Sequence, residues 1–296
     1  YEIGVRLVGS EMCIRDRDVN VAFARNWSKI KELPSGDDVS NNWFIGERLN
    51  VLRDYTYAGV ITADGVTMHT INGDKHYTLQ EVYDKYGPKS PNKLKWYEGQ
   101  MAVNDWNDDG KINDEDKQIY GCTDPKWTGS LSSTMTYKGF DFSFMLYTKQ
   151  GQWSRSYFHE QYMDISDRGR QKMSFDYYIP AGTPVLDKAT GDITYLETPH
   201  MGAYPYPNNY EKTGGGYFSK SSSGVRYQKT SFVKVKNITL GYTFPKKWMS
   251  KIAVKHLRLY VNVLNPFCFT GYDGFDPEWA SANLTDGGPA SVTYQI

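Results

Sequence analysis

The sequence predicts an all-β fold built from long antiparallel strands, and three observations lead to this class. Aromatic residues make up 15% of the 296 residues, with 24 tyrosines among them, and aromatic side chains favour strands. Several segments alternate between apolar and polar residues, as expected for strands with one apolar face. Short turns and long loops alternate between these segments, which is typical of outer-membrane β-barrels.

Composition excludes several other classes of protein. Lys and Arg number 34 and Asp and Glu number 34, so the formal net charge is zero and no long-range field favours nucleic acid. No apolar run approaches the ~20 residues of a transmembrane helix, and no signal peptide is readable. The aromatic content excludes intrinsic disorder. A mean hydropathy of −0.62 is compatible with a barrel, because alternating strands average out as polar.

The N-terminal segment has an unusual character. The run from Val8 to Asp16 resembles a translated sequencing-adapter read-through. We therefore expect residues 1–17 to be a non-native artefact and exclude them from the fold. The alternative is an ordinary short strand. If they are an artefact, the native chain begins earlier and residues 18–296 are a fragment.

The first part of the remaining chain is expected to hold short elements. Residues 19–31 alternate loosely and predict one strand. Residues 44–63 predict one or two more, with a turn at Asp64-Gly65. Helical spacing over residues 77–86 predicts a short surface helix, and an acidic loop follows at 105–116.

The clearest strands come later in the chain. A strand at 131–138 is followed by Gly139 and by a strand at 140–147 whose even-numbered positions are all apolar. Two more strands are expected at 231–244 and in the alternating run 257–263. The stretch 150–230 between the two pairs is rich in Tyr, Gly, Pro and Ser, and predicts a long functional loop.

The sharpest motif is the acidic loop itself, which matches a twelve-residue calcium loop of the EF-hand type. Hard oxygen ligands at this spacing suit Ca²⁺ better than Zn²⁺ or Mg²⁺. Gly110 at the sixth position permits the sharp turn. The alternative is an acidic, solvated turn. We expect a structural Ca²⁺ site, and the candidate ligands are Asp105, Asn107, Asp109, Lys111 through its carbonyl, Asn113 and Asp116.

No catalytic constellation is present in the sequence. The five histidines are scattered, and the sequence lacks a nucleophile elbow, a Walker loop and a dinucleotide fingerprint. The protein is therefore not expected to be an enzyme. Aromatic residues of the long loop could stack on sugar rings, with girdle or loop packing as the alternative; the candidates are Trp153, Tyr177, Tyr178, Tyr204 and Tyr206. A Cys122–Cys268 disulfide is conceivable, although nothing in the sequence places them together.

Several stretches together resemble the SusC/RagA family of TonB-dependent outer-membrane receptors. Residues 104–121 are similar to its D-x-N-x-D-G-x-I-x-x-x-D…G signature, and residues 125–141 to its P-x-x-x-G…Y-K-G-F-D strand pair. Residues 232–242 resemble its F-x-R-L-K-N-I-T-L-G-Y strand. Residues 257–278 resemble its L-R-V-Y…N-L-F…Y-x-G-F-D-P-E ending. No single match is specific, but their order and spacing all agree.

The resemblance implies that residues 18–296 are the C-terminal part of a large, roughly 22-stranded antiparallel transmembrane β-barrel with long extracellular loops, holding roughly its last 8–10 strands. Plug domain, TonB box and final strand would lie outside this chain. The implied location is the cell outer membrane, in contact with its lipid. The implied function is import of oligosaccharide (glycan) or peptide fragments, with a SusD-like surface lipoprotein and a TonB complex as partners, the latter through the missing N-terminal parts.

A second interpretation comes from another class of protein. A secreted β-sandwich glycan-binding module or glycoside hydrolase with a structural calcium site would also have aromatic loops. No persuasive acid pair is visible in the sequence. A continuous sheet with an exposed apolar face would favour the receptor, and two facing sheets with a dry core would favour the sandwich.

Overall fold

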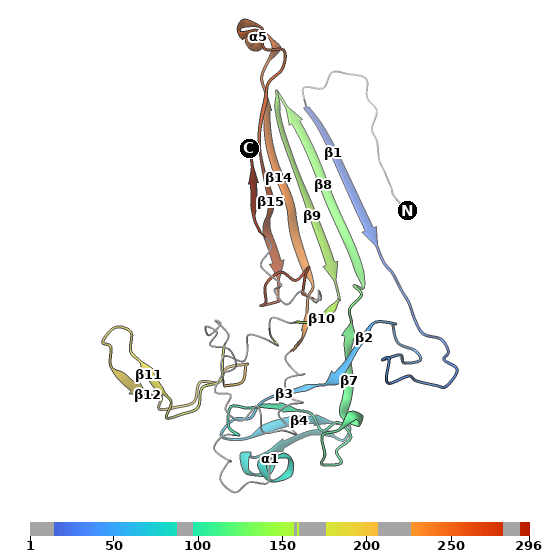
Figure 1. The fold of residues 1–296 in the computed structure, drawn as a ribbon, viewed down its shortest axis with the longest axis vertical. Helices are drawn as coiled ribbons and strands as arrows, with labels where there is room; N and C mark the ends of the chain where they lie inside the picture. Colours follow the sequence, from blue (N-terminus) through green and yellow to red (C-terminus); the bar gives the residue numbers. More distant parts are fainter. Residues whose placement is uncertain (1–14, 88–96, 157–158, 160–175, 207–225, 281–290) are drawn as a thin grey trace. The chain divides into compact units, whose positions relative to one another are not determined.

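The computed structural model describes residues 15–87, 97–156, 159, 176–206, 226–280 and 291–296 (Figure 1). The chain divides into two compact units. One consists of Tyr1–Asn50, Cys122–Ser154 and Lys229–Ile296, and the other of Val51–Gly121 and Arg155–Gln228. Among the described residues, no helix is both long enough and apolar enough to cross a membrane.

The first unit is built on one antiparallel sheet of six strands (Figure 1). Its strand order is β1-β8-β9-β14-β15-β16. Strands β8 and β9 are joined by a tight turn at Lys138-Gly139, and β14 and β15 by a segment that contains α5, Lys246–Met249. The strand bounds are Arg15–Ala24 (β1), Trp127–Tyr137 (β8), Phe140–Gln150 (β9), Phe232–Thr243 (β14), Arg258–Thr270 (β15) and Thr293–Gln295 (β16).

The register gives this sheet one apolar and one polar face. Phe144 pairs with Ser133 of β8 and with Ile238 of β14, and Ile238 pairs with Val263 of β15. Paired residues of antiparallel strands lie on the same face, so the even-numbered residues of β9 from Phe140 to Leu146 share what we call the apolar face. The expected alternation is confirmed. Many of its side chains are exposed, including Val21, Phe140, Leu240, Val261 and Phe269.

A β-bulge interrupts the sheet at one place. The register of β14 shifts between Val235 and Asn237 against both of its neighbours. A bulge inserts one extra residue and moves the following side chains to the opposite face. Lys234 and Asn237 therefore share the polar face, while Val235 and Ile238 share the apolar one. Strict alternation along residues 231–244 would have missed this shift.

Several predicted bounds need correction. The strand expected at 19–31 ends at Ala24 and extends back to Arg15, which pairs with Tyr137. Residues 1–14 lie outside the described residues, and the artefact at 1–17 stays a prediction. The strand expected at 257–263 continues to Thr270, because Phe267 and Phe269 still pair with Val235 and Val233. The described sheet holds six strands, fewer than the 8–10 expected.

The second unit has short strands around its own core. Strand pairs β2–β7, β3–β6 and β4–β5 form it together with helix α1. The buried core includes Ile61, Met68, Val82, Tyr97 and Val103. The bounds are Val51–Tyr55 (β2), Tyr57–Val60 (β3), Val66–Thr70 (β4), Gly73–Tyr77 (β5), Leu79–Tyr86 (α1), Met101–Val103 (β6) and Lys117–Cys122 (β7).

Helix α1 lies within residues 77–86, where helical spacing predicted a helix, and it begins at Leu79. The Thr78 hydroxyl accepts a hydrogen bond from the Glu81 N–H, and the Glu81 carboxylate accepts one from the Thr78 N–H. This reciprocal capping box satisfies two helix-end donors. Hydrogen bonds from the Thr78 N–H and hydroxyl to the Glu81 carboxylate hold the pKa of Glu81 below its ordinary value. Val82 and Tyr83 are the buried residues that fix the helix on the core.

The stretch 150–230 is not all loop. Its described residues form four short strands with the bounds Trp153–Arg155 (β10), Pro184–Leu186 (β11), Ile193–Tyr195 (β12) and Tyr227–Lys229 (β13). β11 pairs with β12 and β10 with β13. Gly191 takes a positive φ of 79° in the β11–β12 hairpin, which glycine allows at no steric cost. Cys122 and Cys268 are both free thiols, so the conceivable disulfide is not present.

Candidate calcium loop and aromatic ligand residues

The acidic loop, residues 105–116, connects β6 to β7 and ends in a short 3₁₀ helix, Asp114–Asp116. Its alternate side chains bond to the backbone two residues further on. The Asn107 Oδ1 accepts from the Asp109 N–H at 3.2 Å, and the Asp109 Oδ1 from the Lys111 N–H at 2.8 Å. Asn113 caps the 3₁₀ helix in the same way. Gly110 has φ +82°, so the sharp turn occurs where the motif predicts it.

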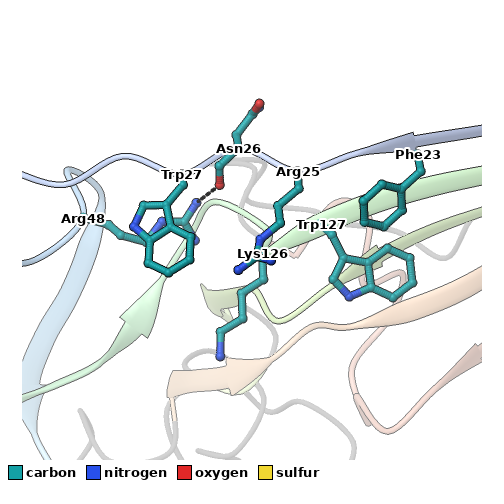
Figure 2. A pocket seen from close by; sticks show the side chains of 7 residues that line it. All are labelled: Phe23, Arg25, Asn26, Trp27, Arg48, Lys126 and Trp127. Carbon is teal, nitrogen blue, oxygen red and sulfur yellow. Dashed lines mark hydrogen bonds between the residues drawn. The ribbon is translucent and has the colours of Figure 1, made fainter. Parts of the chain in front are cut away.

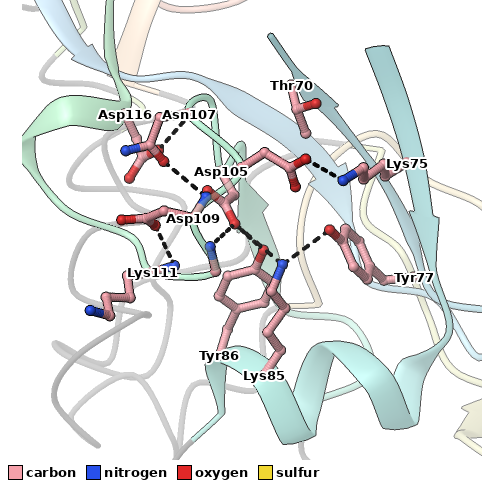
Figure 3. A network of polar contacts seen from close by, with 12 residues as sticks. Thr70, Lys75, Tyr77, Lys85, Tyr86, Asp105, Asn107, Asp109, Lys111 and Asp116 are labelled. Carbon is pink, nitrogen blue, oxygen red and sulfur yellow. Dashed lines mark hydrogen bonds and ion pairs between the residues drawn. The ribbon is translucent and has the colours of Figure 1, made fainter. Parts of the chain in front are cut away.

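Asp105 is the centre of the polar network in Figure 3. Its side chain is fully buried. Oδ2 accepts hydrogen bonds from the Tyr86 hydroxyl at 2.6 Å and from the Gly110 N–H at 2.9 Å, and Lys85 Nζ lies at 3.4 Å. Oδ1 is buried and has no hydrogen-bond partner among the described residues. An unsatisfied buried carboxylate oxygen is costly and marks a place where a cation would be stabilising.

Lys85 supplies a positive charge to this network from helix α1. Its ammonium donates to the Tyr77 hydroxyl at 3.1 Å and lies over the rings of Tyr77 and Tyr86, at 4.8 and 4.9 Å from their centroids. Burial alone would lower the pKa of Lys85, but Tyr77 and Asp105 outweigh burial and raise it. Burial and the hydrogen bond to Asp105 raise the pKa of Tyr86, so that it stays a donor at neutral pH.

Asp116 closes the loop from the other end. Its side chain is buried, and Oδ1 accepts from the Trp106 N–H at 2.8 Å while Oδ2 accepts from the Asn113 N–H at 2.7 Å. Burial raises the pKa of Asp116, and the charge of Asp105 adds to this effect, although the backbone hydrogen bonds oppose it. Two buried carboxylates in one loop, Asp105 and Asp116, would both be stabilised by a nearby cation.

The loop fits Ca²⁺ in its donor chemistry and chain path. It does not gather the full ligand set: among the described residues, no three His, Cys, Asp or Glu side chains converge in a way that could hold a metal ion. Several predicted ligand oxygens are used by backbone N–H groups instead. Within the described part of the chain, Lys111 takes part in the loop's hydrogen bonds through its N–H and not through its carbonyl.

The structure brings together four of the five predicted ligand-binding aromatics. Tyr177 forms an isolated β-bridge with Tyr204. The Tyr178 N–H donates a hydrogen bond to the Tyr204 carbonyl at 2.7 Å, and the Tyr206 N–H donates one to the Gly99 carbonyl at 2.7 Å. The Tyr178 hydroxyl donates to Glu98 Oε1 at 2.6 Å. Tyr177 and Tyr178 are 2% and 0% exposed, so these two rings pack inside the unit and present no surface to a ligand in this conformation.

Tyr204 and Tyr206 are half-buried, and the Tyr204 ring stacks on His159 with centroids 6.0 Å apart. Trp153, in β10, lies under the Lys229 ammonium at 5.4 Å. The ligand-binding role of all five residues stays a prediction. Sequence reasoning missed Lys85, Tyr77 and Tyr86, although a helix ending in Lys-Tyr close before an acidic loop is the signal that could have found them.

A second polar cluster, also missed, lies in the first unit. Lys234 Nζ donates to Asp276 Oδ2 at 2.5 Å and to Glu278 Oε2 at 2.9 Å. Lys236 Nζ donates to both Glu278 oxygens at 2.7 Å. The hydrogen bonds from both lysines outweigh burial and lower the pKa of Glu278. Lys234 and Lys236 of β14 thus form ion pairs with the two acidic residues of the later Asp-Pro-Glu motif.

Comparison with known proteins connects these features to receptors. No family model matches the chain. The TonB-dependent receptor SusC of Bacteroides thetaiotaomicron is 26% identical over 283 residues, which cover 94% of this chain and 24% of that protein. Two TonB-dependent receptors of Formosa agariphila are 28% and 24% identical, over 92% and 86% of this chain. These relatives are TonB-dependent receptors, and the chain is similar to them over most of its length.

Solved structures agree on the fold. The RagAB peptide transporter matches 96% of this chain with a TM-score of 0.54 at 16% identity, and the RagAB peptide importer in the closed-closed state matches with 0.52 at 17%. The expected all-β, antiparallel fold and the resemblance to these receptors are confirmed.

The chain spans about a quarter of the length of these relatives, between 22% and 26% of the curated ones. Partial coverage of that kind agrees with the expected fragment. The relatives are TonB-dependent receptors rather than enzymes, which agrees with the expected receptor class and with the expected outer-membrane location.

Proposed function

We propose that this chain is the C-terminal barrel portion of an outer-membrane receptor that imports glycan or peptide fragments. The observation that carries the proposal is the six-stranded sheet with an exposed apolar face. Phe140, Leu240 and Phe269 are 54%, 54% and 63% exposed on that face, whereas a sheet in aqueous solution buries such a face. Lipid covers it in an outer-membrane barrel. The β-sandwich alternative is not favoured, because it needs this face to be the dry core.

The rest of the proposed mechanism follows from the related receptors. The six strands would form part of a barrel of about 22 strands. The second unit is inserted in the chain between β1 and β8 and between β10 and β13, so its residues belong to the long connections of the sheet. Ligand would bind against these connections beneath a SusD-like lipoprotein. A TonB complex would supply the energy for import.

Gene deletion in the source bacterium tests the proposal. A strain that lacks the full-length receptor is grown on single purified polysaccharides and on protein digests as sole carbon source. We expect growth to fail on one of these substrates and to return when the gene is restored. Membrane fractionation of the parent strain should find the receptor in the outer membrane. Unchanged growth on every substrate, or recovery of the receptor in the soluble fraction, would contradict the proposal.

We further propose that the acidic loop binds one structural Ca²⁺. The buried, unpartnered Asp105 Oδ1 supports this, as does the raised pKa of Asp116. When bound, Ca²⁺ would neutralise the two buried carboxylates and fix the connection that carries them. Asp105, Asn107, Asp109, the Lys111 carbonyl, Asn113 and Asp116 remain the candidate ligands. Lys85, which neutralises Asp105 in this structure, would compete with the cation.

Terbium luminescence tests the calcium proposal directly. Trp106 lies inside the loop and would sensitise Tb³⁺ bound there. We expect excitation of the full-length receptor to give Tb³⁺ emission that Ca²⁺ displaces, and Asp105→Asn to abolish it. Glu115→Gln is the matched control, because Glu115 is not a candidate ligand and an amide oxygen can still accept its bond from Asn107. Equal emission from the parent and the Asp105→Asn receptor would rule the site out.

A further inference from the structure

A cavity of about 490 Å³ lies at one end of the six-stranded sheet (Figure 2). It forms where β1 ends at Ala24 and β8 begins at Trp127. This end carries the long connection from β1 to β8, opposite to the tight Lys138-Gly139 turn. In outer-membrane barrels the long connections face outward, so the cavity belongs at the outer boundary of the membrane.

The cavity combines aromatic and cationic side chains. Phe23 and Trp127 pack with ring centroids 5.6 Å apart, and Arg25 lies over the Trp27 ring at 5.0 Å. Arg25, Arg48 and Lys126 line it, and no carboxylate does. Among the described residues none of these three cations has an ion-pair partner. The nearby Asp124 does not line the cavity, and its carboxylate accepts from the Asn50 amide.

Arg48 is held in place and still has an unused donor. Its Nη1 donates to the Asp124 carbonyl at 3.0 Å, and its Nη2 to the carbonyls of Pro125 and Asn26 at 3.3 and 3.4 Å. Nε is buried and has no partner among the described residues. A buried guanidinium N–H without an acceptor is costly. Planar guanidinium groups suit phosphate well, so Arg48 gives the cavity a cation whose position is fixed by its hydrogen bonds.

An apolar groove of about 280 Å³ continues from this cavity along the apolar face and shares Phe23 and Trp127 with it. Its lining includes Val21, Leu131, Leu146 and Val233. Gly129 pairs with Phe23 and Thr148 in this region, and a Cβ there would come within 3.3 Å of the Trp127 ring. The missing side chain keeps the groove open. The cationic cavity is therefore continuous with the apolar groove.

We propose that the cavity and groove together bind one phosphorylated glycolipid of the outer leaflet. Its sugar phosphates would lie among Arg25, Arg48 and Lys126, its sugar ring against Trp27 and Trp127, and one acyl chain in the groove. The charge complementarity selects an anionic headgroup, and the adjoining groove selects a lipid over a soluble sugar. The inference rests on the proposed outer-membrane function, which places lipid against this face.

Native mass spectrometry of the full-length receptor in a nonionic detergent tests the inference. The probes are diphosphorylated lipid A, the same lipid without phosphates, and a soluble diphosphorylated glucosamine disaccharide. The test variant is Arg25→Gln/Lys126→Gln, which leaves the hydrogen bonds of Arg48 intact. The matched control is Lys138→Gln/Lys247→Gln, which removes two exposed charges at the opposite end of the sheet.

We expect the test variant to bind diphosphorylated lipid A about tenfold more weakly, as for the loss of strong charge-assisted hydrogen bonds. The control variant should bind like the parent receptor, and the phosphate-free lipid should bind weakly to all. Equal lipid A binding by parent and test variant would overturn the inference. Equally tight binding of the soluble disaccharide would also overturn it, in favour of a site for soluble anionic sugars.

These outcomes are distinguishable from failure of the proposed function. If the receptor is located in the outer membrane and is needed for growth but does not bind lipid A, only the glycolipid inference is refuted. If the protein is recovered outside the outer membrane, the proposed function is refuted, whatever the protein binds in detergent.

Discussion

At the scale of single residues, the most consequential side chain is Lys234. It is 2% exposed in the side chain, in a strand of a sheet whose other face is apolar. A buried ammonium is tolerated only when it is paired and fully hydrogen-bonded. Asp276 and Glu278, more than forty residues later, provide that pairing. These ion pairs connect the segment that carries Asp276 and Glu278 to β14.

Lys234→Met should therefore destabilise the receptor strongly, by about 3 kcal/mol, because it leaves Asp276 buried without its partner. Lys236→Met is the matched control, since Lys236 is 29% exposed and shares only Glu278. Thermal unfolding of the full-length receptor in detergent, followed by heat-dependent gel mobility, measures the difference. Equal unfolding temperatures for the two variants would show that the buried pair contributes nothing special.

At the scale of elements, three strands meet at one tight contact. Arg258 of β15 donates from Nε and Nη2 to the two oxygens of Asp141 in β9, at 3.0 and 2.6 Å. Gly241 of β14 lies between them, and a Cβ there would come within 2.5 Å of Asp141 Oδ1 and 2.7 Å of Arg258 Nη2. The ion pair can span the middle strand only because that strand carries a glycine.

Gly241→Ala should push Asp141 and Arg258 apart and cost about 1–3 kcal/mol through overpacking. Gly271→Ala is the control, because no atom lies within 4 Å of a Cβ at that position. The same unfolding assay applies. Adding Asp141→Ala to Gly241→Ala should restore part of the stability by making room. If Gly241→Ala unfolds at the same temperature as Gly271→Ala, the close approach has no energetic consequence.

At the scale of the whole molecule, the described main sheet is open. β1 and β16 are its edge strands, and the side chains of Val21, Phe23 and Tyr294 near these edges are 65%, 64% and 71% exposed. Open edges beside an exposed apolar face promote association. In the proposed receptor, further strands pair with these edges and lipid covers the face.

We therefore expect residues 17–296 expressed alone in aqueous buffer to aggregate, because nothing would cover either the edges or the apolar face. Size-exclusion chromatography with circular dichroism measures this, and the full-length receptor in detergent is the control. A monodisperse, folded and soluble product from residues 17–296 would count against the proposed barrel.

Much of the local structure followed from the sequence. Period-two alternation predicted the faces of β9 and β15, helical spacing over residues 77–86 predicted helix α1, and Gly110 turns the acidic loop at the expected position. These features depend on neighbours within a few residues. The order of several motifs along the chain was enough to identify the related receptors.

The tertiary structure decided which residues meet. Alternation assigns a side chain to a face but names no partner across the sheet, so the contacts of Lys234 with Asp276 and of Asp141 with Arg258 were invisible in the sequence. Burial of Tyr177 and Tyr178 likewise depends on what covers them. The cavity near Trp127 exists because the ends of β1 and β8 are brought side by side over a hundred residues apart, and only the register of the folded sheet can do that.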